Sequence, residues 1–235
     1  MRTVGRLFGT PVRVDGLTWL PLAPLVVWIL MAVLAGRKQS QRSLKQRVAI
    51  GGLAMPLVLG AEWGHNLAHM AAGQLTGKPY DEMIIYGGMP RLLCSVESDR
   101  QVLPQQHILR SLGGPVFNGS KVILLSMARR WLKPETLAAE LAEIALQVHT
   151  FIATVAFLPI PGIDGGPLLK WSLVLAGEEE AQADQLVRRM NWLLGAGLEA
   201  GMLACLRMRR WFAAFIFGML GVGALGIASG ALKER

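Results

Sequence analysis

Cysteine and charged residues are both scarce in this chain of 235 residues. Its two cysteines, Cys94 and Cys205, are too few for a disulfide framework and form no Cys-x-x-Cys metal pair. Charged residues make up 17% of the chain, whereas a typical soluble domain carries about 25%. The shortage of charge argues against an ordinary soluble domain and indicates a protein that lies in a membrane.

Long apolar runs with few charges explain this composition, because about 20 such residues in a helix cross the roughly 30 Å hydrocarbon core of a bilayer. We expect six transmembrane helices, over residues 18–36, 48–73, 111–128, 138–160, 190–206 and 211–230. Lys and Arg outnumber Asp and Glu by 24 to 16 and gather at the ends of these runs, as charge-directed membrane orientation produces. No basic patch alternates with aromatic residues, so we expect the lipid bilayer as a partner and no nucleic acid.

Two stretches outside these runs have the composition of strands. Residues 9–15 and 80–94 contain short β-branched or alternating runs bounded by glycine and proline. They could pair as a small sheet, which must lie at the membrane edge or under protein because an open sheet edge cannot face lipid. We therefore expect an all-α polytopic membrane protein with about six transmembrane helices and a small β-sheet at the membrane edge. No internal repeat or linker divides it, which favours a single membrane-embedded domain over residues 1–235.

The second apolar run carries three ionisable residues, Glu62, His65 and His69. On a helix, His65 and His69 lie about 40° apart in projection and about 6 Å apart along the axis. This spacing presents two imidazoles to one metal ion, although an intramembrane histidine can also simply bond a neighbouring helix. Glu62 lies one turn before His65, so all three share one stripe of an apolar helix. Burying such a stripe in a membrane is costly and indicates a functional site.

A carboxylate that could complete such a site lies in the segment PGIDGG at residues 161–166. Asp164 could be only a turn residue there. Broken backbone at membrane depth, however, is tolerated where it lines a cavity, and hydrolytic zinc sites commonly use two histidines, a carboxylate and a water. The combination favours a Zn²⁺ site at His65, His69 and Asp164.

Three segments in order resemble the motifs of site-2 proteases, the intramembrane zinc metalloproteases. They are GAEWGHNLA at 60–68, GGPVFN at 113–118 and LPIPGIDGG at 158–166. The resemblance covers about residues 5–175 and leaves the extra spans, about 190–230, generic. It implies a multi-pass integral protein of a bacterial cell membrane that cleaves a segment of a transmembrane protein by metal-activated water.

The family's helix motif, His-Glu-x-Gly-His, fits this chain in two registers. In the first, Ala61 replaces the first histidine, Glu62 and His65 match, and His69 supplies the missing imidazole. In the second, His65 and His69 are the two histidines and Asn66 replaces the glutamate. The first has more matching positions, but both give the same metal ligands.

The resemblance also implies roles beyond the metal. Glu62 would be the general base, and Asn118 would bind substrate near the active site. Ala61, and Ala156 in place of an asparagine before the Pro-rich turn, depart from the catalytic pattern. The alternative is therefore an inactive homologue that acts as a membrane-embedded binding or regulatory protein.

Overall fold

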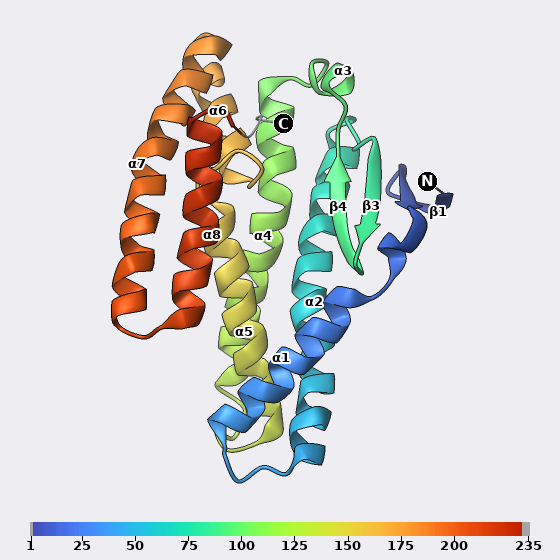
Figure 1. The fold of residues 1–235 in the computed structure, drawn as a ribbon. Helices are drawn as coiled ribbons and strands as arrows, with labels where there is room; N and C mark the ends of the chain where they lie inside the picture. The colour runs from blue at the N-terminus through green and yellow to red at the C-terminus, as the bar shows by residue number, and fades with distance from the viewer. Residues whose placement is uncertain (1, 232–235) are drawn as a thin grey trace. The chain divides into compact units, whose positions relative to one another are not determined.

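The computed structural model describes residues 2–231 (Figure 1). The chain forms two compact units. Unit 1 contains Met1–Val102 and Leu112–Val155, and unit 2 contains Leu103–Ser111 and Ala156–Arg235. The single domain expected from the sequence stays a prediction.

A helix occupies each of the six expected apolar runs: α1 (Leu22–Lys38), α2 (Leu44–Leu75), α4 (Pro104–Arg129), α5 (Leu137–Ala156), α7 (Glu180–Arg207) and α8 (Trp211–Ala228). Among the described residues, three segments are long and apolar enough to cross a membrane: Gly16–Lys38, which includes α1, then α5 and α8. The helices α2, α4 and α7 carry more polar and charged side chains, and in α2 the polar stripe itself lowers the hydropathy. The structure therefore supports three spans.

The turn between α1 and α2 is fixed at both ends. Ser43 caps α2, because its hydroxyl accepts the Gln46 N–H while the Gln46 side chain accepts the Ser43 N–H. Arg42, just before the cap, makes a bidentate ion pair with Glu140 near the start of α5. The pair ties the turn to α5 within unit 1.

A four-stranded sheet packs against α2, with strand order β1-β2-β3-β4. The strands are β1 (Arg2–Leu7), β2 (Thr10–Val14), β3 (Glu82–Tyr86) and β4 (Met89–Leu93). Parallel pairing of β2 with β3 confirms that residues 9–15 and 80–94 form one sheet. The β3–β4 hairpin lies beside α2 (Figure 1). Buried side chains of β2, β3 and α2 form a common core, which consists of Val12, Met70 and Met83 with Trp63 and Leu67 packed against them.

The outermost strand, β1, was not expected from the sequence. Every described residue of β1 is exposed, so no buried alternation marks it as a strand. The remaining short elements are the 3-10 helix η1 (Gly16–Trp19) and α3 (Val96–Asp99).

In unit 2 the chain folds back through the Pro-rich turn into α6 (Gly165–Leu175). A Cβ at Gly165 would lie 2.3 Å from the Leu158 carbonyl oxygen. A Cβ at Gly166 would lie 2.7 Å from the Ile160 carbonyl oxygen. The turn therefore needs both glycines of the Asp-Gly-Gly sequence. Their close approach places Asp164 at the N-cap of α6.

The helices α7 and α8 form a closely packed hairpin. A Cβ at Gly195 would lie 2.7 Å from the Leu225 side chain. Asn191 of α7 is fully buried, and its amide donates a 2.7 Å hydrogen bond to the Pro159 carbonyl. The α7 helix therefore holds the turn that carries Asp164.

Candidate metal centre

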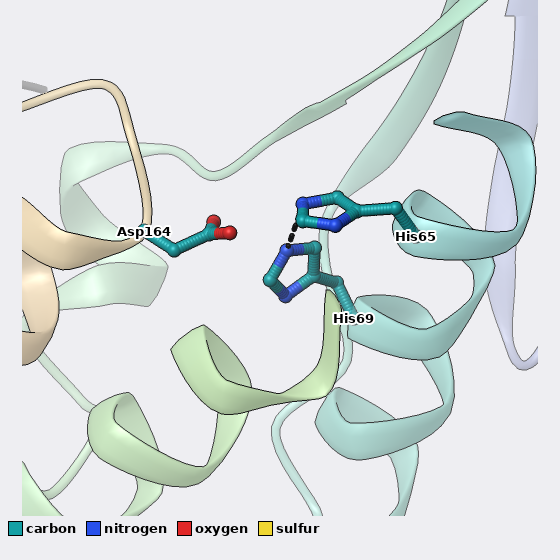
Figure 2. Close-up of side chains that lie close together, drawn as sticks. All are labelled: His65, His69 and Asp164. Carbon is teal, nitrogen blue, oxygen red and sulfur yellow. Dashed lines mark hydrogen bonds between the residues drawn. The ribbon is translucent and has the colours of Figure 1, made fainter. Parts of the chain in front are cut away.

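The two histidines of α2 meet at their Nε2 atoms, which lie 3.0 Å apart (Figure 2). Both side chains are buried, and the rings meet edge to face with centroids 4.6 Å apart. The nitrogens of two histidines on one tetrahedral zinc ion lie about 3.3 Å apart, given metal–nitrogen bonds of about 2.0–2.1 Å. The pair already has the separation that one ion requires.

Asp164 offers the third ligand atom. One ligand atom from each of His65, His69 and Asp164 lies within 4.8 Å of the other two, and Figure 2 draws the three side chains together. Asp164 is half-buried, and a carboxylate with two imidazoles suits zinc as well as other transition metals. The three residues nominated from the sequence could therefore hold a metal ion.

A glycine of α4 leaves room for that ion in unit 1. A Cβ at Gly114 would lie 2.4 Å from His69 Nε2 and 2.5 Å from His65 Nε2. At Gly113 a Cβ would lie 2.6 Å from the Ala68 carbonyl oxygen, so α4 packs directly on the backbone of α2. Within the motif GGPVFN, Gly113 permits the close approach and Gly114 clears the space beside both nitrogens.

Groups of α4 contact the far nitrogen of each ring. The Nδ1 atom of His65 lies 2.8 Å from the Asn118 Nδ2 atom, and the Gly114 N–H donates to His69 Nδ1 at 3.4 Å. Each imidazole is thus held on one edge while its Nε2 edge faces the other histidine. Ligand histidines in metal sites donate this far N–H to an acceptor, so the long contact from the Gly114 N–H has the opposite polarity and does not prepare His69 for a metal ion.

The other end of the Asn118 side chain reaches α5. Its Oδ1 atom lies 2.5 Å from His149 Nδ1, and both residues are buried. A histidine on an apolar helix often bonds a neighbouring helix, but nothing in the sequence identifies Asn118 as the partner of His149.

Glu62 lies on the same helix as the two histidines, and its side chain contacts Asn66. The Asn66 amide donates to the Glu62 Oε1 atom at 3.2 Å and to the Glu62 carbonyl at 3.0 Å. Within residues 2–231, the metal-capable group consists of the two histidines and Asp164 and does not include Glu62. The base role of Glu62 and the substrate role of Asn118 stay predictions.

Comparison with known proteins gives a fold. No protein-family model matches the chain, and no curated protein matches its sequence. A solved structure described as Site-2 Protease from Methanocaldococcus jannaschii is similar, with a TM-score of 0.57 and 11% identical residues. The alignment covers 97% of this chain and 94% of that one. At this identity the likeness shows the fold, which agrees with the one that the motifs implied.

Proposed function

We propose that the chain is an intramembrane metalloprotease of the site-2 type, with Zn²⁺ held by His65, His69 and Asp164. The observation that carries the proposal is the pair of Nε2 atoms 3.0 Å apart, beside space that only a glycine leaves open. The shared fold supports it. The substrate would be a segment of a transmembrane protein, and the chain would cross a bacterial cell membrane with six spans.

A bound zinc ion supplies Lewis acidity, lowering the pKa of a coordinated water to about 7. In this proposal the chain's own residues move the proton. Glu62 would be the base and would take up the proton on its carboxylate, whose Oε1 atom accepts a hydrogen bond from the Asn66 amide. The hydrogen bond from Asn66 holds the Glu62 side chain along its own helix.

A second candidate is an inactive homologue that binds a membrane partner. One specific observation favours it: the histidines that meet are His65 and His69, and in that register Asn66 stands where the family has its glutamate. A neutral amide cannot accept the proton. In addition, Ala61 is fully buried where the other register would have its first ligand.

A cleavage assay separates the two candidates. The purified protein is reconstituted in vesicles with a transmembrane segment as substrate, and Glu62→Gln is compared with the unsubstituted protein. Loss of cleavage by 100-fold or more, on the order of the effect of a general base, is expected for the protease. Unchanged cleavage in Glu62→Gln removes Glu62 from the mechanism. Absence of cleavage in the unsubstituted protein, with activity appearing in Asn66→Glu, identifies the inactive homologue.

A further inference from the structure

Asn118 of α4 joins two buried histidines on two other helices. Its side chain is fully buried, its Nδ2 atom lies 2.8 Å from His65 Nδ1, and its Oδ1 atom lies 2.5 Å from His149 Nδ1. The three residues belong to α2, α4 and α5 of unit 1. One amide therefore makes both of its strong hydrogen bonds to imidazole rings.

The chemistry of a carboxamide gives these two contacts opposite polarity. The NH₂ end only donates and the oxygen only accepts, so one histidine must present a bare nitrogen and the other an N–H. A half-turn of the amide exchanges the two ends and leaves the heavy atoms in nearly the same places. The same pair of contacts therefore serves either orientation.

Metal binding selects one of these orientations. A metal ion at His65 Nε2 requires the lone pair on that atom, so the ring proton must lie on Nδ1. His65 Nδ1–H then needs an acceptor, which the Asn118 oxygen provides after a half-turn of the amide from the orientation in the structure, where Nδ2 faces His65. The NH₂ group, turned toward α5, donates to His149 Nδ1, and the neutral His149 ring adopts the matching tautomer with its proton on Nε2.

We propose that Asn118 is a positioning residue that holds His65 in its metal-binding tautomer, with His149 as the acceptor that fixes the amide. This inference rests on the metal site proposed above and gives Asn118 a role other than substrate binding. It also explains why Asn118 is fully buried between helices rather than directed at an open surface.

The space around Asn118 is closely packed. The Phe117 ring lies 5.9 Å from the His149 ring, and it sits so close to α2 that a Cβ at Gly64 would lie 2.2 Å from Phe117 Cζ. The Phe117 ring therefore fills the space between α2 and His149, and Asn118 itself is fully buried. A half-turn of the amide needs no additional space, because its two ends are nearly the same size.

The test measures metal affinity, by competition of the purified full-length protein with a chromophoric chelator for Zn²⁺ and for Co²⁺. Asn118→Leu keeps the size of the side chain but accepts no hydrogen bond, and we expect 10- to 100-fold weaker binding, as for other groups that hold ligand histidines. Asn118→Asp accepts a hydrogen bond from His65 Nδ1–H as well as asparagine does, so its affinity should stay within about threefold of the original.

Glu140→Gln is the matched control for lost stability. It breaks the partly buried ion pair with Arg42 in the same unit, and Glu140 contacts neither ligand histidine, so this variant should bind metal normally. A role in packing alone would lower the melting temperature of the two Asn118 variants and leave both affinities unchanged.

The outcomes are separable. Metal binding at full strength in Asn118→Leu overturns the inference while the metal site stands. If Asn118→Leu does not fold, a loss of more than tenfold in folded Asn118→Asp overturns it instead. Unsubstituted protein that binds neither ion contradicts the metal site, and the inference with it.

Discussion

Replacing Gly114 with alanine should abolish metal binding while leaving the fold in place. The added Cβ would lie 2.4 Å from His69 Nε2 and 2.5 Å from His65 Nε2. The Cβ would also lie 2.4 Å from His65 Cε1, so both imidazole rings must move out of the arrangement that brings their Nε2 atoms together. One zinc ion needs both nitrogens about 2.0–2.1 Å away, so we expect the displaced rings to lose affinity by at least about 100-fold, or roughly 2.7 kcal/mol.

The same substitution has a modest structural cost. The histidine rings must move by about 1 Å to relieve the contact, and overpacking of this kind typically costs about 1–3 kcal/mol of folding free energy. Gly119→Ala is the matched control on α4, because no atom lies within 4 Å of a Cβ added there. Alanine is the better helix former, so this control should be as stable as the original protein or slightly more stable.

The assay is zinc content by elemental analysis after purification in detergent, together with a melting temperature for each variant. The expected result is zinc in the original protein and in Gly119→Ala, and none in folded Gly114→Ala. A full complement of zinc in Gly114→Ala would refute the reasoning, because zinc binding would then not need the two rings where the structure has them.

Three further predictions concern stability, measured by unfolding in detergent. Asn191→Leu removes the hydrogen bond to the Pro159 carbonyl and should cost about 1–3 kcal/mol; an unchanged stability would show that α7 does not hold the turn. Glu140→Gln removes the carboxylate charge that pairs with the partly buried Arg42 guanidinium and should cost about 1–3 kcal/mol, whereas unchanged stability would show that the ion pair does not stabilise the fold. Burial lowers the pKa of Lys170, but hydrogen bonds and charge from two carboxylates of α7 outweigh it and raise the pKa overall. The folding free energy that Lys170 contributes is therefore fully present below the ordinary lysine pKa of about 10.4, and it is lost as the pH rises through the higher pKa of the folded protein. Lys170→Met should reduce the loss of stability at alkaline pH. An identical dependence of stability on pH in this variant would contradict the prediction.

Local patterns were enough to find the main elements of the fold. The spacing of His65 and His69 gave their common helix face, because helical geometry alone decides it. Short β-branched runs bounded by turns gave the pairing of residues 9–15 with 80–94. The fourth expected span ends at Ala156 instead of residue 160, since Pro159 cannot continue the helix.

The remaining features depend on contacts that no local pattern contains. Gly114 matters because it has no side chain, and only the tertiary structure shows that the Nε2 atoms of His65 and His69 lie where a side chain at this position would be. The Asn118–His149 hydrogen bond joins residues on different helices, so neither residue identifies the other. The α7 helix begins at Glu180, ten residues before the expected run at 190–206, because one helix can continue from polar into apolar surroundings.

The most direct test of the account is the metal content of purified protein and of two ligand variants, His65→Ala and Asp164→Ala. One zinc ion per chain is predicted in the original protein, and less than about a tenth of that in either variant. Each variant must first show a cooperative melting transition. Zinc bound equally in all three proteins would contradict the site at His65, His69 and Asp164.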